Sequence, residues 1–514
     1  MPDKLVFVFQ TGVCVLSTFL MILNGTIISP AMTKIATDLD GVDSQAWIAS
    51  AFLVGACASQ PVAGKFSDLF GRRVVLGFGA LSFMIGCLVC ALSHTINMLI
   101  AGRTIQGAGG GCLLSMSFII VADIASVEVR PRIQALLGIS YGIGSVSGPI
   151  IGGALVDYVT WRWDFWLGFI LSSIIFVVAV FFFKEPANVS RDSVLSKLKR
   201  VDWIGVVLAM GAICCILIAL SFGSILGQVI ANPHAYGAFT ACGIALTLLF
   251  IVETKFAAEP LLPKSIFSNF HAVVVFFFML CVGAQFVANM FISPMLFQAL
   301  YGVDAISSGI RLVPYMVCLI FGAIGTTAAL KFFPFTKFFL VLGAASAVIG
   351  YGLFLTVNEN SSWGAQAGYL GFCGFALGIS QTNGLVNVQS VVAEKDVAIT
   401  TAMFNFFMFM GAAIGVSIYQ VLIRTFVVHN VADVPLEYLY VANKFGALKN
   451  YLFIRNMPVE YQGPIIHVYA RAMHSVFIIP LGVAAVGFIL SLFIKNVRFG
   501  QPAQTVKDPE NVQA

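Results

Sequence analysis

A ten-residue segment, GKFSDLFGRR at positions 64–73, combines opposite charges with two glycines. Asp68 and Arg72 are four positions apart, so their side chains can pair on one face of a short helix or turn. Gly64 and Gly71 permit a close backbone approach and a tight turn. A basic loop that only fixed membrane topology would explain the arginines but not this spacing. We therefore interpret the segment as functional.

Arg103 lies inside an apolar stretch, with Gln106 and Gly107 three and four positions further on and hence on its helical face. An arginine inside a membrane span is costly and usually lines a cavity or joins a pairing site. A second interpretation stays open, in which the side chain extends to the membrane surface.

The segment GIGSVSGPIIGG at 142–153 combines small residues with a proline. Gly144, Gly148 and Gly152 are spaced by four and form a smooth stripe for contact with another helix. Pro149 removes one backbone hydrogen bond and favours a kink. We expect a bent, closely packed helix that can itself be a moving part.

The elements that position these residues must lie in a membrane. The chain has 514 residues, of which 59% are hydrophobic and only 10% are charged, against about a quarter charged in soluble proteins. The net charge of +5 is small and dispersed, which excludes a nucleic-acid-binding protein. The sequence has no HExxH, GxSxG or Walker lysine motif, so neither a membrane enzyme nor an ATP-driven pump is indicated.

A bilayer core about 30 Å thick requires roughly 20 apolar helical residues per crossing. By that measure we predict fourteen spans, near 6–30, 45–63, 74–96, 97–122, 133–156, 164–183, 203–222, 236–252, 272–300, 306–330, 338–357, 363–393, 398–422 and 468–494. The polar stretch 423–467 is predicted to be a loop on the outer face.

The predicted spans fall into groups of six, two and six. We predict an N-terminal six-helix bundle at 1–190, a cytoplasmic linker with two additional helices at 191–265, a C-terminal six-helix bundle at 266–498 and a short cytoplasmic tail at 499–514. Most of the 28 Lys and Arg residues then fall on one side, which places both termini in the cytoplasm. Asn360 begins a glycosylation sequon predicted to face outward.

The three motifs resemble the signatures of the major facilitator superfamily: the loop motif at 64–73, R-x-x-Q-G at 103–107 and G-x-x-x-G-P-x-x-G-G at 144–153. In that family the third motif is associated with antiporters. The grouping of spans resembles the fourteen-span drug:proton antiporter branch, particularly its fungal members, which include multidrug exporters and vacuolar transporters of basic amino acids. The resemblance covers essentially the whole chain.

The resemblance implies an all-α membrane protein in which two six-helix bundles, joined by two extra helices, expose a central cavity alternately to either side. It also implies that Asp68 and Arg72 form a latch with the carboxylate that ends the fourth span, here Asp123. The residues that it assigns to transport and gating are Gly64, Asp68, Gly71, Arg72, Arg73, Asp123, Arg103, Gln106, Gly107, Gly144, Gly148, Pro149 and Gly152.

The sequence departs from the branch in the first span, where Asn24 stands in place of the usual Asp and Thr33 in place of a proline. The acidic residues nearest to predicted spans are at their ends, namely Asp157, Asp164 and Glu253. We therefore expect no buried carboxylate of the kind that usually carries protons. The candidate proton site is His474, and Asp68 and Asp123 are alternatives.

Neutral polar side chains within the spans are the candidates for substrate contact. They are Asn24, Gln285, Asn289, Gln381, Thr382, Asn383, Asn387 and Asn405. Amides of this kind also hydrogen-bond between helices, and both roles stay open for each of them.

We predict a secondary active, proton-coupled exporter of amphipathic small molecules. The alternative is a vacuolar transporter of basic amino acids or another physiological solute, and a channel or transporter-like receptor is the other class considered. The predicted partners are a small-molecule substrate, protons and the lipid bilayer, without nucleic acid, cofactor or metal. The protein is predicted to be a monomeric, multi-pass protein of the plasma or vacuolar membrane.

Overall fold

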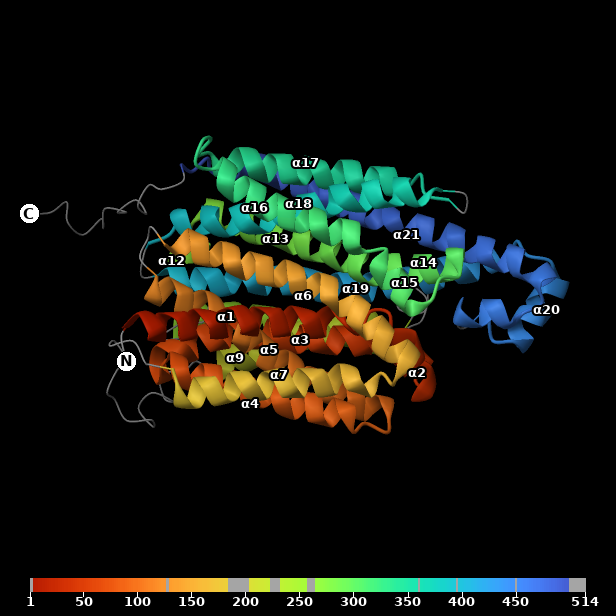
Figure 1. Cartoon of the computed structure of the whole chain (residues 1–514), viewed down its shortest axis with the longest axis horizontal. Coiled ribbons are helices and arrows are strands. Elements are labelled where there is room, and N and C mark those ends of the chain that lie inside the picture. The colour runs from red at the N-terminus through yellow and green to blue at the C-terminus, as the bar shows by residue number, and fades with distance from the viewer. Residues whose placement is uncertain are drawn as a thin grey trace, which may run out of the picture.

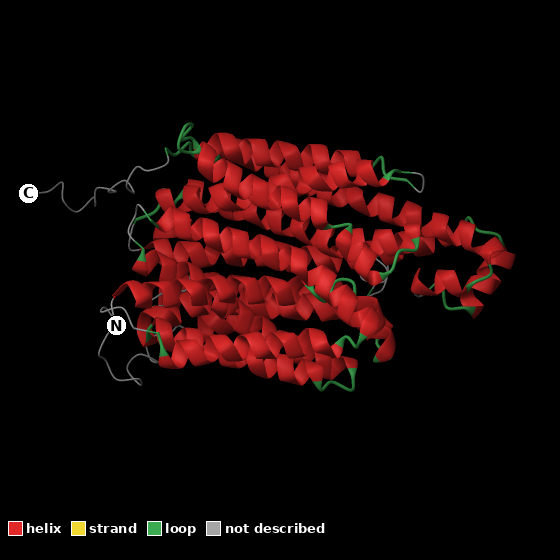
Figure 2. Ribbon diagram, viewed as in Figure 1, coloured by secondary structure: helices red, strands yellow, loops and turns green. Residues whose placement is uncertain are grey.

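The computed structural model describes residues 3–125, 129–183, 203–221, 232–256, 264–358, 361–393, 396–448 and 451–498. Asn360 and the tail at 499–514 lie outside these ranges. The described residues form helices, apart from turns and one isolated β-bridge between Phe335 and Arg498 (Figure 2). The expected all-α fold is confirmed.

The first half contributes eight of the described α-helices before residue 222: α1 (Asp3–Thr26), α2 (Met32–Asp38), α3 (Gln45–Phe70), α4 (Arg72–Ala91), α5 (Ile96–Ile124), α6 (Arg130–Tyr158), α7 (Arg162–Phe181) and α9 (Trp203–Ser221). The helices that follow are α11 (Pro233–Ile251), α12 (Lys264–Phe267), α13 (Phe270–Val287), α14 (Ser293–Tyr301), α15 (Ala305–Ile310), α16 (Val313–Ala329), α17 (Thr336–Phe354), α18 (Trp363–Ser390), α19 (Val397–Val431), α20 (Leu436–Lys444) and α21 (Val459–Phe493).

Twelve helical segments of the described chain are long and apolar enough to cross a membrane, so the predicted count of fourteen is not confirmed. The two predicted spans that do not qualify correspond to α9 and α18. The helix α9 is apolar along its described stretch Trp203–Ile216. The helix α18 is 28 residues long, but its glycines and amides make it less apolar than its neighbours.

The segment 423–467, predicted to be an outer loop, is largely helical, and its side of the membrane stays a prediction. α19 continues to Val431, α20 and a short 3₁₀ helix (Tyr451–Asn456) follow, and α21 begins at Val459. This segment is polar, yet apolar residues such as Ala442 and Ile454 are buried in it, and Tyr469 of α21 donates to the Ala447 carbonyl across 3.0 Å. Burial of these few side chains keeps the segment helical beyond the membrane-spanning part.

The helices form two groups that lie side by side (Figure 1). We call α1 and α3–α7 the N-terminal bundle, and α13–α19 with α21 the C-terminal bundle. α9 and α11 pack against each other, and α9 also contacts α3 and α19, where Phe66 of α3 meets Trp203 edge to face. The predicted domain boundaries, with two additional helices between two bundles, remain a prediction.

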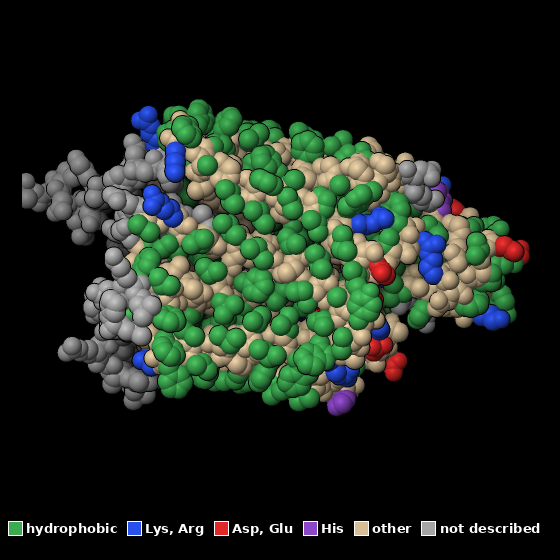
Figure 3. All heavy atoms as spheres, viewed as in Figure 1, with side chains coloured by type: hydrophobic (Ala, Val, Ile, Leu, Met, Phe, Trp, Pro, Cys, Tyr) green, Lys and Arg blue, Asp and Glu red, His purple; other side chains and the backbone are tan. Residues whose placement is uncertain are grey.

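The molecule has two ends, which we name by their features: the Gly71 end and the α20 end, at the left and right of Figure 1. α1 begins and α21 ends at the Gly71 end, where Phe9 stacks on Phe182 and the Thr336 amide donates to the Val497 carbonyl. Hydrophobic side chains cover the middle of the visible face, and charged side chains gather toward the ends (Figure 3). That distribution suits a protein embedded in lipid.

Candidate transport site and gates

Gly71 links α3 to α4 as a single residue with φ of 96°. This left-handed conformation favours glycine, because a Cβ would be strained there. The tight turn expected in the loop motif is therefore present. It allows α4 to start immediately after α3 and to return toward the α20 end.

Arg72 ties three helices together at the Gly71 end. Its Nε donates to Oδ2 of Asp123, at the end of α5, across 2.8 Å, and its Nη1 donates to Oγ of Ser67 in α3 across 3.1 Å. Both charged side chains are partly shielded, with 16% and 28% exposed for Arg72 and Asp123. Two members of the predicted latch are thus in contact. Asp68 belongs to α3, but its side chain lies outside the described part.

The loop motif also contacts elements beyond this pair. Arg73 donates to the Val180 carbonyl at the end of α7. A Cβ added at Gly64 would lie 3.6 Å from the Cβ of Ala402 in α19. Gly64 therefore marks a place where the two bundles approach each other closely.

Arg103 is buried in the N-terminal bundle, with 1% of the residue exposed. Its Nε donates to the Ile48 carbonyl across 3.0 Å, and its Nη1 donates to the Asn24 carbonyl across 3.2 Å and to Oε1 of Gln106 across 2.7 Å. The guanidinium lies over the Phe52 ring, 4.3 Å from its centroid. The structure therefore shows a pairing site and not an arginine that extends to the membrane surface.

Gln106 connects this arginine to α1 and α4. Its Nε2 donates to Oδ1 of Asn24 across 3.0 Å and to Sγ of Cys87 across 3.0 Å. Asn24 also faces Gly168 of α7, where an added Cβ would lie 2.5 Å from its Oδ1. The neighbouring Gly107 contacts the backbone of α3. Asn24 is thus part of a packed polar cluster.

Asp164 completes the cluster from the first turn of α7, and its side chain is fully buried. It interacts electrostatically with Arg103, and neither carboxylate oxygen has a hydrogen-bond partner among the described residues. The expectation of no buried carboxylate is wrong. Asp164 is near the end of its own helix, but α7 packs against α4 and α1, and Gly168 lets it approach Asn24 and Cys87 closely. Glu253 is also buried.

The glycine stripe of α6 packs against α1. A Cβ added at Gly144 would lie 3.0 Å from the Phe19 carbonyl oxygen. At Gly148 it would lie 2.0 Å from Thr26 Oγ1, and at Gly152 it would lie 1.9 Å from the Ile27 carbonyl oxygen. Pro149 lies within α6. Its carbonyl packs closely against Gly309 of α15, where an added Cβ would lie only 2.6 Å from the carbonyl oxygen. The stripe therefore joins α6 to α1, and Pro149 meets the C-terminal bundle.

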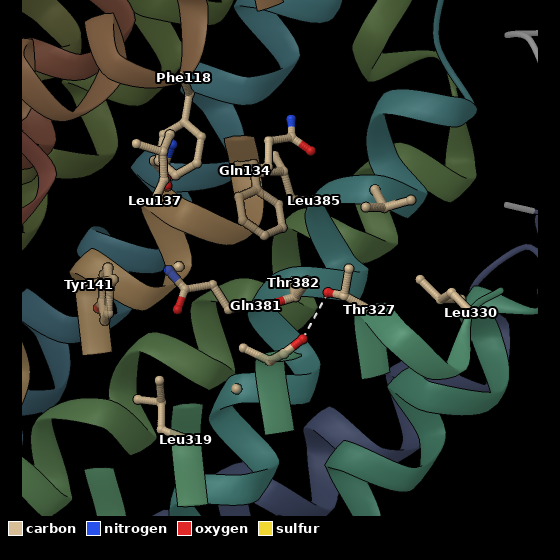
Figure 4. A pocket seen from close by; sticks show the side chains of 16 residues that line it. Phe118, Gln134, Leu137, Tyr141, Leu319, Thr327, Leu330, Gln381, Thr382 and Leu385 are labelled. Carbon is tan, nitrogen blue, oxygen red and sulfur yellow. Dashed lines mark hydrogen bonds between the residues drawn. The ribbon is translucent and has the colours of Figure 1, made fainter. Parts of the chain in front are cut away.

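A cavity lies between α5 and α6 of the N-terminal bundle and α16, α18 and α19 of the C-terminal bundle (Figure 4). It is lined by amides, hydroxyls and apolar or aromatic side chains, and none of the described residues that line it is charged. The lining residues are Phe118, Gln134, Leu137, Gly138, Tyr141, Leu319, Ala323, Thr327, Leu330, Gly378, Gln381, Thr382, Leu385, Val386, Phe404 and Asn405.

The cavity belongs to the half of the molecule nearer the Gly71 end, because α6 separates from α16 there. A Cβ added at Gly142 would lie 2.4 Å from Ile320, whereas Gly138, one turn earlier, has nothing within 4 Å. A chain of amides around Gln134 links the two bundles beside the cavity: Gln134 Nε2 donates to Gln389 Oε1 across 3.3 Å, and Gln389 donates to Thr401 across 2.9 Å.

The α20 end is closed by contacts between the bundles. Thr33 and Tyr451 share a hydrogen bond of 3.0 Å, and Arg424 donates to the Val42 carbonyl across 2.7 Å. Ser29 of the chain after α1 donates to the Met290 carbonyl. The structure is therefore closed at the α20 end and hollow toward the Gly71 end.

Of the predicted substrate residues, Gln381, Thr382 and Asn405 line this cavity and the others do not. Gln285 lines a separate small hollow within the C-terminal bundle, and Asn289 donates to Tyr351 beside it. The remaining three sit elsewhere: Asn24 in the Arg103 cluster, Asn383 buried with a bond to the Ile379 carbonyl, and Asn387 bonded to Thr336.

His474 lies on an exposed face of α21, with its ring bonded to the Leu355 carbonyl. It lines neither hollow. Sequence reasoning missed Gln134, Tyr141 and Thr327 as cavity residues. Gln134 and Tyr141 are seven positions apart on one helical face, a spacing that indicates a shared side, but only the fold shows that this side faces the other bundle.

The family model described as Major Facilitator Superfamily matches residues 14–416. The chain belongs to the Major Facilitator Superfamily. As a superfamily member it is a membrane transporter of small molecules and not an enzyme, in agreement with the sequence prediction.

Several curated superfamily relatives carry names of efflux proteins. The chain is 30% identical over 492 residues to "Efflux pump dotC" of Dothistroma septosporum, covering 94% of this chain and 83% of that protein. It is 28% identical to the "Aspyridones efflux protein" of Neocamarosporium betae, with 98% and 90% covered. It is also 28% identical to "Efflux pump roqT" of Penicillium rubens, with 95% and 90% covered.

Solved superfamily structures share the fold at low sequence identity. A bacterial homologue of the human lysosomal transporter Spinster matches with a TM-score of 0.63 and 12% identity, covering 95% of this chain and 98% of that one. The xylose transporter XylE from E. coli matches with a TM-score of 0.57 and 13% identity, with 96% and 98% covered. These likenesses support the predicted fold.

Proposed function

We propose that this chain exports amphipathic, uncharged small molecules by alternating access, in exchange for protons. The observation that carries the proposal is the cavity between the bundles, where Gln381, Thr382 and Asn405 provide hydrogen-bonding groups among aromatic and aliphatic walls. A site of this composition orients a ligand through a few polar groups and binds most of it through apolar contact.

The absence of charge from the lining residues favours this substrate class over basic amino acids. A fixed cation bound in a low-dielectric cavity needs a carboxylate or a dense set of oxygens to replace its hydration. The cavity lining contains neither Asp nor Glu. The curated relatives, which are named as efflux proteins, support export as the direction.

The cycle that we propose alternates between the present arrangement and one closed at the Gly71 end. In the present one, contacts such as Thr33 with Tyr451 close the α20 end, and the cavity reaches the amide chain around Gln134. The Arg72–Asp123 contact, with Asp68 as the third predicted member, biases that equilibrium. In this proposal the Gly71 end and both termini face the cytoplasm. The protein lies in a plasma or vacuolar membrane and works as a monomer.

Transport in liposomes tests this proposal. Purified chain in liposomes with an imposed pH gradient should move radiolabelled cycloheximide, an uncharged amphipathic probe, against its gradient, and should not move radiolabelled arginine. Collapse of the pH gradient with a protonophore should stop the uphill flux. Arginine flux without cycloheximide flux would support the basic-amino-acid alternative, and a cycloheximide flux that ignores the pH gradient would contradict proton exchange.

A further inference from the structure

The N-terminal bundle contains an acidic side chain that the cavity does not use. Asp164 has no exposed surface, and neither of its carboxylate oxygens has a hydrogen-bond partner among the described residues. An ionised carboxylate in such a place is costly unless a positive charge lies nearby. Arg103 supplies that charge from α5, because its guanidinium carbon lies 6.0 Å from the ring centroid of Phe165, the residue next to Asp164. The Nη2 of Arg103 also has no hydrogen-bond partner among the described residues.

Arg103 does not depend on Asp164 for its other contacts. Three oxygens accept from its Nε and Nη1, those of Ile48, Asn24 and Gln106, and the Phe52 ring lies beneath the guanidinium. A structural ion pair would use the carboxylate as a direct acceptor, because charge-assisted hydrogen bonds are the strongest available. Here the arginine keeps its three oxygen acceptors whether the Asp164 carboxylate is charged or neutral.

We infer that Asp164 is the proton-binding residue of this transporter, an inference that rests on the proposed proton exchange. In the arrangement described above the cluster is closed to water. In the alternate arrangement, which opens the cluster to water, the carboxylate takes up one proton from hydronium to form an uncharged acid or returns it, so each step changes the cluster charge by one. When Asp164 is protonated, Arg103 is held by its three oxygens alone. When Asp164 is ionised, it attracts the guanidinium and competes with them.

The packing connects this change to the cavity. One of the competing oxygens is the carbonyl of Asn24, near the end of α1. The same end of α1 packs against the glycine stripe of α6, where Gly148 faces Thr26 and Gly152 faces Ile27. The other end of α6 carries Gln134 and Tyr141 into the cavity. A shift of α1 relative to α5 is therefore transmitted to a cavity wall.

The neighbouring titratable groups do not substitute for Asp164. In the cluster itself α5 contributes Arg103 and α4 contributes Cys87 and Cys90, which are buried. No acidic residue of the described chain bonds to Arg103. Charged and titratable groups further toward the α20 end are Lys34, Asp38, His94, Asp157 and Arg162, which bond to other partners or face solvent.

The first experiment measures protonation without any substrate. Infrared spectra of the purified full chain, labelled with ¹³C-aspartate and recorded across the neutral pH range, should show a protonated-carboxyl band that titrates and that is missing from Asp164→Asn. The exposed Asp433→Asn should retain the band. A spectrum in which Asp164→Asn keeps the band, or in which the wild type has none, overturns the inference whatever the protein transports.

The second experiment uses cycloheximide flux in liposomes. Asp164→Asn should lose accumulation driven by the pH gradient and should keep cycloheximide counterflow, which needs the cavity but no net proton movement. Asp164→Asn with Asn24→Asp places a carboxylate beside Gln106 within the same cluster and should restore part of the driven accumulation. If Asp164→Asn also loses counterflow, Asp164 has a structural role. If Asp164→Asn keeps the accumulation driven by the pH gradient, Asp164 is not the residue that couples protons to transport, and either result contradicts the inference. Failure of the wild type to move cycloheximide would count against the proposed function and leave the infrared result standing.

Discussion

Thr33 Oγ1 and the Tyr451 hydroxyl lie 3.0 Å apart, so a residue of α2 holds the segment just before α21 across 418 positions of the chain. Tyr451 also donates to Oε1 of Gln298 across 3.3 Å, and Gln45 donates to Thr33 across 3.0 Å. These buried side chains form a polar seal at the α20 end. Thr33 stands where the resembling branch has a proline, which could not form this bond.

Tyr451→Phe should weaken the closure of the α20 end. Removing the hydroxyl eliminates two hydrogen bonds of about 1 kcal/mol each, enough to shift a two-state equilibrium roughly tenfold or more toward opening at that end. Distances between spin labels on α2 and α20, measured in liposomes, report the shift. Tyr440→Phe, on the exposed face of α20, is the matched control and should leave the distances unchanged.

The glycine stripe should tolerate no methyl group. At Gly152 a Cβ would collide with the carbonyl of Ile27, the residue that follows α1, and backbone atoms cannot move aside as a side-chain end can. Gly152→Ala should therefore lower the free energy of unfolding by about 1–3 kcal/mol, as overpacking does elsewhere. Gly138→Ala, on the same helix with nothing within 4 Å, should have no such cost. Thermal melts of the two purified variants give the comparison, and equal melting would contradict the packing.

The span boundaries were largely predictable from the sequence, because hydropathy reports what lipid requires. The predicted span 97–122 corresponds to α5 (Ile96–Ile124), and 133–156 to α6 (Arg130–Tyr158). The extent of α19 was not predictable in this way. Arg424, His429 and Asn430 in its last turns suggested a loop. The helix continues because Ile423 and Val427 of the same turns are buried and α19 packs against α21.

The candidate site was predictable only in part, for a related reason. Gln381 and Asn405 could be named from their polarity inside apolar spans, but Asn24 has the same signature and lies in a packed cluster. Which face of a helix meets the other bundle is a property of packing. Asp164 was missed because its position near a helix end suggested contact with water, and the helices around it exclude water.

Gln381→Glu should change which substrates the cavity accepts. The substitution places a carboxylate among neutral amides without altering the side-chain length, so uncharged probes should bind more weakly and amphipathic cations more tightly. Competition against cycloheximide counterflow by rhodamine 6G measures the change, with an expected shift of about tenfold, the size of one modest charge interaction. Gln366→Glu, in the same helix but outside the cavity lining, is the control. An unchanged competition profile would mean that Gln381 does not contact substrate.

Asp304 should make the α20 end sensitive to acid. Its carboxylate caps α15 by accepting from the Ser307 amide across 2.8 Å, and this contact with the Ser307 side chain and amide lowers the pKa of Asp304 below its usual 3.8. The stabilisation is present above the unfolded pKa and is lost as pH falls through the lower folded value. Because Asp304 is mostly exposed, Asp304→Ala should cost at most about 1 kcal/mol. The difference in melting temperature between wild type and variant should therefore vanish in strong acid.

The contact between Arg72 and Asp123 gives a test of the latch at the opposite end. With 16% and 28% of these side chains exposed, the pair is shielded enough for its charges to attract, and the bond of 2.8 Å fixes α4 to the end of α5. Asp123→Asn should keep the shape and weaken the attraction, which shifts the equilibrium between the two arrangements and lowers the transport rate. Arg72→Asp combined with Asp123→Arg restores opposite charges in swapped positions and should recover part of the rate that either single change loses. Surface expression and melting temperature identify variants that merely fold poorly. A double variant no better than the single ones would show that Arg72 acts through Ser67 or the α3–α4 turn, and that the carboxylate of Asp123 has no part in gating.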